Sequence, residues 1–96
     1  MAKGYLLVSI TVTDPDAYAR YVQVSAEVLK AFGGRLLVKA ETAIIKEGAG
    51  RTRNVIFEFE SFEKVKAYWD SPEYQAAKLL RIGAADGEFI LIEGVD

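Results

Sequence analysis

The sequence predicts an α+β fold in which a four-stranded antiparallel sheet carries two helices on one face. The first observation behind this prediction is the order of the hydrophobic patterns, which runs strand, helix, strand, strand, helix, strand. Two such split units form the ferredoxin-like βαββαβ plait. The second observation is length, because a chain of 96 residues forms one domain with one core, here residues 1–96.

The first part of the chain is predicted to form a strand and a helix. Residues 5–12 are apolar and β-branched apart from Ser9 and Thr11, a pattern typical of a central strand covered on both faces. Asp14 and Pro15 suit the N-cap and the first position of a helix. A glycine pair ends this helix after residue 32. Its inner face is predicted from the three-and-four spacing of Tyr18, Tyr21, Val22, Ser25, Val28, Leu29 and Phe32.

The middle of the chain is predicted to be extended. Residues 35–38 and 43–46 form one bent strand or two short strands, and residues 48–50 form a hairpin loop. Residues 53–60 return as a strand whose alternate side chains point to opposite faces. One set is Val55, Phe57 and Phe59, and the other is Ile56, Glu58 and Glu60. The pattern leaves open which set faces the helices.

A second helical region, from residue 61 to about residue 81, is predicted to be broken. Ser61 is the N-cap of its first helix, and Ser71 followed by Pro72 marks the start of a second one. Serine is a favoured N-cap. Proline suits the first helical position because the N–H that it lacks would have no partner within the helix. Such a break is a common place for a pocket mouth or a partner surface. Residues 89–92 then form the last buried strand.

Cysteine and histidine are both absent, which limits the possible chemistry. The chain cannot provide a disulfide, a thiolate nucleophile, a Ser-His-Asp triad or a standard zinc site. We therefore expect no metal and no other cofactor. Any proton transfer would use carboxylates, lysine, tyrosine or water held by arginine.

Charge and hydropathy exclude further classes of partner. The 14 acidic and 12 basic residues give a net charge of −2, which offers no attraction to nucleic acid or to anionic lipid. Residues 54–59 lack the basic and glycine positions of an RNA-recognition strand. No apolar run approaches the roughly 20 residues that span a membrane. Residues 1–5 lead into a strand without the apolar core of a signal peptide, so we expect a cytoplasmic protein.

The strands at residues 5–12 and 89–92 are apolar on both faces, whereas a plait covers only one face of its sheet with helices. A monomer would expose the other face as a hydrophobic patch. We therefore expect a homodimer in which two sheets pack against each other.

Glu58 is the candidate catalytic residue, because it is a carboxylate in the middle of a strand and between two phenylalanines. If it lies inside the fold, desolvation would raise its pKa and suit it to act as a general base. The alternative is a structural ion pair with Arg35, Arg53 or Arg81, or exposure at an edge.

The candidate ligand-binding residues are aromatic rings and arginines. Arginine can hold a carboxylate bidentately, and phenols can donate to an oxygenated ligand. The alternative is ordinary packing of the rings and a capping or dimer-rim role for the arginines. We predict one cleft between sheet and helices that joins Glu58 and Arg35 from the strands to Tyr18, Tyr21, Tyr68, Trp69, Tyr74 and Arg81 from the helices.

Several short segments together carry a resemblance to a known family. They are residues 12–15 with Tyr18 and Tyr21, 33–35, 58–59 with 61–62, 71–75, Arg81 followed by Ala84 and Ala85, and 93–94. Over nearly its whole length the chain resembles the family known as domain of unknown function 1330, of the dimeric α/β-barrel group. It departs from that family at Ala40 and Glu41, where a glycine pair is common, and at Glu60, where proline is common.

The resemblance implies a barrel of two facing sheets, one from each subunit, and no assigned activity. Fold relatives in the group include cofactor-independent monooxygenases, isomerases and haem-linked enzymes, which is an analogy of fold alone. Our hypothesis is that the protein binds or converts a small metabolite in the cleft without a metal. The alternative is a non-catalytic structural or regulatory dimer whose cleft is only core packing.

Overall fold

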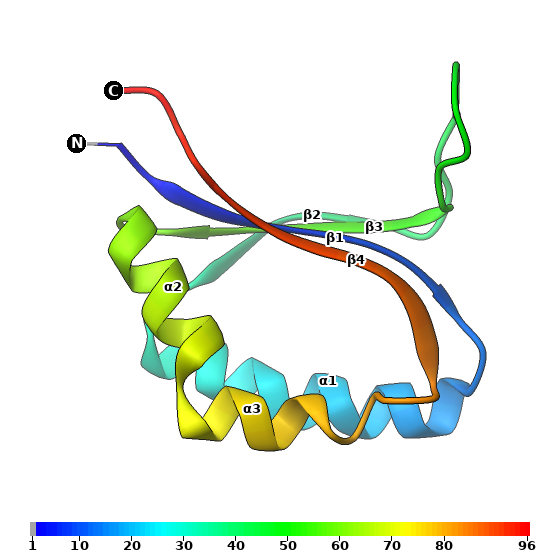
Figure 1. Cartoon of the computed structure of the whole chain (residues 1–96), viewed down its shortest axis with the longest axis horizontal. Coiled ribbons are helices and arrows are strands. Elements are labelled where there is room, and N and C mark those ends of the chain that lie inside the picture. The colour runs from blue at the N-terminus through cyan, green and yellow to red at the C-terminus, as the bar shows by residue number, and fades with distance from the viewer. Residues whose placement is uncertain (1) are drawn as a thin grey trace.

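The computed structural model describes residues 2–96, and Met1 lies outside the described residues. Figure 1 shows a layer of strands above a layer of helices, with both ends of the chain at the same edge of the molecule. In chain order the elements are β1 (Gly4–Val12), α1 (Pro15–Ala31), β2 (Arg35–Ala40), β3 (Arg53–Phe59), α2 (Phe62–Asp70), α3 (Pro72–Lys78) and β4 (Ala85–Glu93).

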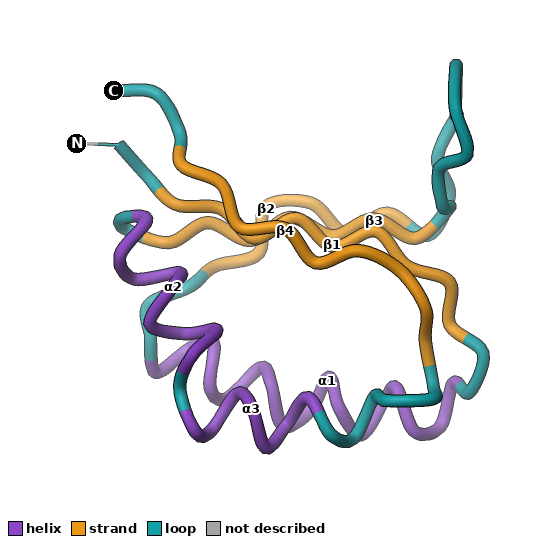
Figure 2. Tube along the Cα trace, in the orientation of Figure 1, coloured by secondary structure: helices purple, strands orange, loops and turns teal. Residues whose placement is uncertain are grey.

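The strands form one four-stranded sheet in the order β2-β3-β1-β4. Each neighbouring pair is antiparallel, and β1 is central, with Leu7 opposite Ile56 of β3 on one side and Ile90 of β4 on the other. The tube in Figure 2 shows all the helices on one side of this sheet. The predicted ferredoxin-like plait is therefore confirmed. A bulge between Leu36 and Val38 interrupts the pairing of the edge strand β2.

Polar caps determine where the helices begin. Asp14 accepts a hydrogen bond from the amide of Ala17 at 3.2 Å, and Ser61 accepts one from the amide of Lys64 at the same distance. These bonds satisfy N–H groups that have no partner within the helix. Helix α1 and helix α2 therefore start where the sequence predicts.

The break between α2 and α3 is also confirmed. The hydroxyl of Ser71 accepts from the amide of Tyr74 at 3.0 Å and donates to the carbonyl of Tyr68 at 2.8 Å. One buried serine thus ends α2 and begins α3. In Figure 1 the break turns the chain, so that α2 descends from the sheet and α3 runs beside α1.

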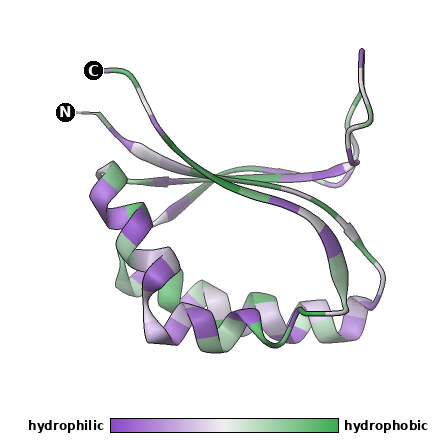
Figure 3. Cartoon of the chain, in the orientation of Figure 1, coloured by the Kyte–Doolittle hydropathy of each residue, from purple (hydrophilic) through white to green (hydrophobic). Residues whose placement is uncertain are grey.

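The core lies between the sheet and the helices, and strand alternation decides what enters it. Every second residue of β1 is buried there, as are Val55 and Phe59 of β3. Hydrophobic segments in Figure 3 alternate with polar ones along α1, consistent with one inward face. The buried core cluster is Leu6, Val8, Ile10, Tyr18, Tyr21, Val55, Phe59, Val65, Tyr68, Tyr74 and Ala77.

Two predicted boundaries are wrong. Residues 43–46 are not a strand, because they belong to a long connection, residues 41–52, that pairs with no other strand. Its apolar side chains are exposed, Ile44 to 84%. Strand β4 is longer than predicted, because pairing with β1 extends back to Ala85, opposite Val12. Within residues 2–96, no helix is long and apolar enough to cross a membrane.

The sheet face turned away from the helices, which we call the outer face, has no cover in the described part of the chain. A row of apolar side chains crosses this face from one edge strand to the other. Neighbours in the row are paired residues, in the order Val38, Ile56, Leu7 and Ile90. Both end members of the row are more than 40% exposed. The 41–52 connection stands up on this same side of the sheet (Figure 1).

Candidate active or ligand-binding cavity

A cavity of about 280 Å³ lies between helix α1 and the inner face of the sheet. We call it the α1 cavity. Its wall is mainly apolar and comes from five of the elements. The lining residues are Val8, Tyr18, Tyr21, Val22, Ser25, Ala26, Leu29, Leu36, Lys39, Arg53, Val55, Phe57 and Tyr68.

Helix α1 gives the cavity its polar aromatic wall. Tyr18, Tyr21 and Ser25 recur at helical spacing, so they share one face of the helix, and all three are buried. The rings of Tyr18 and Tyr21 lie 5.3 Å apart between centroids. Val22 lies on the same side but is 40% exposed, which places it at the mouth of the cavity.

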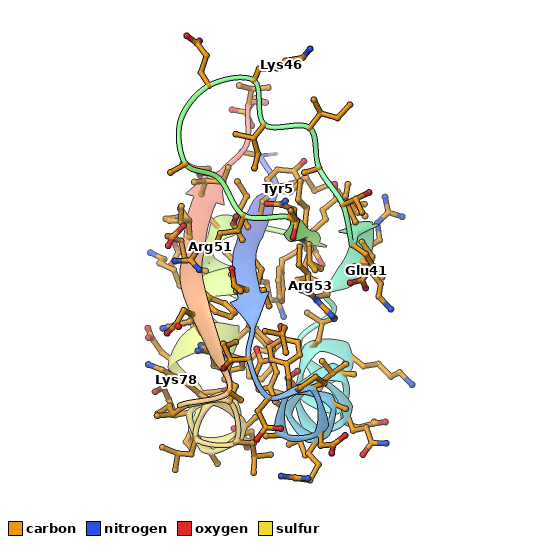
Figure 4. All side chains as sticks on the ribbon, turned by 90° about the vertical axis from the view of Figure 1, so that its right-hand side faces the viewer. Tyr5, Glu41, Lys46, Arg51, Arg53 and Lys78 are labelled. Atoms are coloured by element: carbon orange, nitrogen blue, oxygen red, sulfur yellow. The ribbon has the colours of Figure 1, made fainter. Side chains whose placement is uncertain are left out.

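Two cationic side chains also line the cavity, Lys39 of β2 and Arg53 of β3. Arg53 has the same strand parity as Val55, and Lys39 lies directly opposite Val55, so both lie on the inner face. Figure 4 shows Arg53 beside Glu41, and its Nη1 donates to that carboxylate at 3.4 Å. Its guanidinium lies over the Tyr18 ring at 5.0 Å.

The Nε of Arg53 is buried without a hydrogen-bond partner among the described residues. A buried donor left unbonded costs free energy, and a charged one costs more. An oxygen of a bound ligand would satisfy it. Of the two cations in the cavity wall, Arg53 is therefore the one with a buried N–H donor available for a ligand oxygen.

A second polar cluster lies behind the cavity and is centred on Tyr74, which is completely buried. The Tyr74 hydroxyl lies 2.9 Å from that of Tyr21 and accepts a hydrogen bond from Nη2 of Arg81 at 3.2 Å. The guanidinium of Arg81 stacks on Phe89, 3.8 Å from the ring centroid, and lies 6.0 Å from the Trp69 ring.

Arg81 is only 9% exposed and has no ion pair within the described part of the chain. Burial acts to lower its pKa, but the hydrogen bond to Tyr74 and the nearby phenols outweigh this effect and raise it, so the guanidinium stays charged. Aromatic faces stabilise the charge in place of a carboxylate. Its Nε has no hydrogen-bond partner within residues 2–96.

Three buried phenols, two in the cavity wall and one in the cluster behind it, are neutral hydrogen-bonding groups. Burial, followed by the nearby Tyr21 phenol, raises the pKa of Tyr18 to about 12. Burial also raises the pKa values of Tyr68 and Tyr74, more strongly. These side chains therefore keep their protons at neutral pH and can donate them.

The raised pKa values predict a loss of stability at alkaline pH. In the unfolded chain a phenol ionises near pH 10, whereas in the folded protein the raised pKa moves ionisation to a higher pH. The stability that this difference contributes is complete below pH 10 and is lost as the pH rises through the folded pKa. We expect the free energy of unfolding to fall between pH 10 and 12, by about 1.4 kcal/mol per pH unit for each retained proton. Urea unfolding across this range, with tyrosinate absorbance, measures it. A stability that stays constant to pH 12 would contradict the prediction.

Glu58 does not lie in this cavity, and the prediction of one cleft holding all the candidate residues is wrong. Because Phe57 and Phe59 point inward, Glu58 points to the outer face. There it forms an ion pair with Arg35 at 3.0 Å and accepts a hydrogen bond from the Tyr5 hydroxyl at 3.3 Å. The structural ion pair considered above as the alternative is the arrangement found. The Arg35 side chain is 71% exposed.

The structure divides the predicted ligand residues into three groups. Tyr18, Tyr21 and Tyr68 line the cavity. Tyr74, Trp69 and Arg81 lie behind it in one aromatic cluster, in contact with Tyr21 through Tyr74. Arg35 lies with Glu58 on the other side of the sheet.

Arg53, Lys39 and Ser25 are cavity residues that the sequence did not suggest as ligand-binding. The available signals were the strand parity of Arg53 with Val55 and the helical spacing of Ser25 with Tyr18 and Tyr21. Lys39 offered no such signal, because the bulge in β2 breaks the regular alternation there.

The fold and the cavity together define a small α+β plait with an apolar chamber between the sheet and the helices. The chain belongs to the family described as Domain of unknown function (DUF1330), whose model matches residues 3–95. This confirms the resemblance seen in the sequence. No curated protein matches the chain.

Several solved structures share the fold. A protein of unknown function from Rhodopseudomonas palustris aligns with a TM-score of 0.78 and 19% identity, over 99% of this chain and 84% of the other. SnoaB, a cofactor-independent oxygenase from Streptomyces nogalater, aligns with a TM-score of 0.69 and 10% identity, over 100% and 96%. A dimeric ferredoxin-like protein of unknown function from Thermobifida fusca aligns with a TM-score of 0.61 and 12% identity, over 98% and 92%. At these identities the likeness shows the fold alone.

Proposed function

We propose that this protein binds a small, mainly apolar metabolite with an anionic oxygen group in the α1 cavity. The observation that carries the proposal is an apolar chamber whose wall contains two cations, one of them with an unbonded buried Nε. Ligand sites are typically apolar pockets with a few convergent polar groups. A volume of about 280 Å³ suits a body of one or two rings.

The arrangement at Arg53 supports an anionic group in particular. Its hydrogen bond to Glu41 is long, at 3.4 Å, and the Glu41 side chain is 61% exposed, so the pair is weak and open to exchange. A ligand carboxylate could take the place of Glu41 on the guanidinium and bind it bidentately. Lys39 adds a second positive charge to the same wall.

We further propose that the protein is a homodimer formed through the outer face. The apolar row there, with Ile90 at 48% and Val38 at 41% exposure, forms a patch typical of an interaction surface. The 41–52 connection stands on the same side of the sheet and would contact the edge of a second sheet packed there (Figure 1). The Thermobifida fusca neighbour, described as dimeric, supports this arrangement. Light scattering at micromolar concentration should give twice the mass of the chain.

Ligand binding is tested with 2-naphthoate as a fluorescent probe of an apolar body carrying a carboxylate. Val22→Trp should weaken its binding at least about tenfold, because the indole fills the cavity mouth while the residue starts 40% exposed and tolerates a larger side chain. Val24→Trp is the matched control, since Val24 is 43% exposed on the same helix but does not line the cavity.

The anionic group is tested separately with Arg53→Gln, which removes the charge from the cavity wall. We expect a loss of 2-naphthoate affinity of about tenfold. Arg51→Gln should leave the affinity within about twofold, because Arg51 bonds Thr11 and Glu88 instead of lining the cavity. Absence of binding to the wild-type protein, or equal effects of the matched substitutions, would disprove the proposed function.

A further inference from the structure

We propose that Arg81 sets the direction of a hydrogen-bond chain through Tyr74 and Tyr21, so that Tyr21 offers its hydroxyl proton to the α1 cavity. The inference rests on the proposed function and deepens it. It assigns the ligand to molecules that carry a carbonyl or a comparable neutral oxygen acceptor on their apolar body.

The chain begins at a group that can only donate. A guanidinium has N–H donors and no acceptor, and Arg81 directs Nη2 to the Tyr74 oxygen at 3.2 Å. Tyr74 is completely buried, so no solvent reaches its hydroxyl. Within the described residues, the acceptor within hydrogen-bond distance of its proton is the Tyr21 oxygen, at 2.9 Å.

The direction of the Tyr21–Tyr74 bond follows from this arrangement. If Tyr21 donated to Tyr74, the Tyr74 proton would be buried without an acceptor, at the cost of an unsatisfied donor. If Tyr74 donates to Tyr21, both its oxygen and its proton are satisfied. The second arrangement is preferred because the proton left over then belongs to Tyr21, which lines the cavity, and not to the fully buried Tyr74. Each bond of the chain also polarises the next.

Tyr21 therefore accepts from Tyr74 and keeps its own proton for a further acceptor. Arg81 also lies within hydrogen-bonding reach of the Tyr21 oxygen, and because a guanidinium can only donate, this contact too makes Tyr21 an acceptor. Tyr21 is one of the residues that line the α1 cavity. A ligand bound in the cavity can therefore supply the acceptor for the Tyr21 hydroxyl proton.

This arrangement gives the cavity two distinct polar requirements. Arg53 and Lys39 favour an anionic oxygen, and the Tyr21 proton is a neutral donor that can bond a second acceptor on the apolar body, such as a ketone. Arg81 does not line the cavity, so it is a positioning residue that acts through Tyr74. Its charge would also strengthen Tyr21 as a donor by polarising the chain.

The experiment compares two neutral probes of nearly the same shape, 2-acetylnaphthalene and 2-isopropenylnaphthalene. Only the ketone can accept a hydrogen bond. The ratio of their affinities in the wild type and in Tyr21→Phe cancels their difference in hydrophobicity. We expect Tyr21→Phe to lower the preference for the ketone about three- to tenfold, as loss of one neutral hydrogen bond predicts.

The role of Arg81 is measured by the infrared carbonyl band of 2-acetylnaphthalene labelled with ¹³C at its ketone. In the wild type the band should lie at the lower frequency of a hydrogen-bonded ketone. Arg81→Met should move it upward, because Tyr21 can then donate to Tyr74. Arg81→Lys keeps a donor and should restore part of the shift. A purely structural role would change the affinity for both probes without moving the band.

The outcomes separate the two proposals. If both probes bind the wild type but the ratio and the band are the same in Tyr21→Phe, the hydrogen-bond chain is wrong and the ligand cavity stands. If neither neutral probe binds the wild type while 2-naphthoate does, the hydrogen-bond chain is wrong and the ligand cavity stands. If 2-naphthoate also fails to bind, both proposals are wrong. Should Arg81→Met fail to fold, Tyr21→Phe still tests the donor, because it keeps the ring that packs in the core, and the band in Arg81→Lys tests the role of Arg81.

Discussion

Replacement of Tyr74 by alanine is expected to lower the free energy of unfolding by about 3–5 kcal/mol, as for other large buried aromatic residues. Tyr74 has no exposed surface, and its ring centroid lies 4.8 Å from those of both Tyr68 and Trp69. Its removal also takes away the hydroxyl that accepts a hydrogen bond from the buried charge of Arg81. Since small domains have roughly 5–15 kcal/mol in total, the urea midpoint should fall sharply.

Tyr74→Phe separates the hydroxyl from the ring. It should cost about 1–3 kcal/mol, because the ring still packs but Arg81 and Tyr21 both lose a partner in a buried place. Tyr5→Phe is the matched control. Its hydroxyl bonds Glu58 at 3.3 Å outside the core, and that carboxylate keeps Arg35 as a partner, so the loss should cost less than about 0.5 kcal/mol. Equal costs for the two substitutions would show that the buried hydroxyl contributes nothing special.

Replacement of Ile90 by lysine should weaken the proposed dimer at least about 100-fold. Ile90 is 48% exposed in the single chain, so the monomer can accept a lysine there. Between two facing sheets the ammonium would be buried without a partner, which costs several kcal/mol, and about 2.8 kcal/mol already corresponds to the stated change. Sedimentation velocity over a concentration series measures the shift from dimer to monomer.

Ile82→Lys is the control for this substitution. Ile82 is 63% exposed and belongs to the turn between α3 and β4. Figure 1 shows this turn in the helix layer, on the side of the sheet away from the outer face. The control substitution should leave the dimer unchanged. A dimer that tolerates lysine at position 90, or that weakens equally with lysine at position 82, would place the interface elsewhere.

The sequence by itself determined the order of the elements and most of their boundaries, because the signals involved are local. A cap such as Ser71 acts on an amide three residues away, and Tyr18, Tyr21 and Ser25 share a helix face through the pitch of a single helix. The alternation of Val55 and Glu58 onto opposite faces is local as well. The sequence also carried the family resemblance, which the match over residues 3–95 confirms.

Only the tertiary structure decided which face of β3 meets the helices. Alternation requires Glu58 to oppose Phe57 but does not say which of them points inward, so the sequence allowed a cleft that included Glu58. The structure settles the direction because burial of Phe59 against Tyr68 is favourable, whereas Glu58 has Arg35 and Tyr5 as partners on the outer face.

The cluster behind the cavity was likewise decided by tertiary packing. The Tyr21 and Tyr74 hydroxyls meet across 53 residues of sequence, and no spacing rule connects positions on separate helices. Residues 43–46 show the converse case, since an apolar run becomes a strand only when a neighbour offers its backbone, and here none does. Contacts within one element could thus be read from the sequence, whereas contacts between elements depend on how the layers pack.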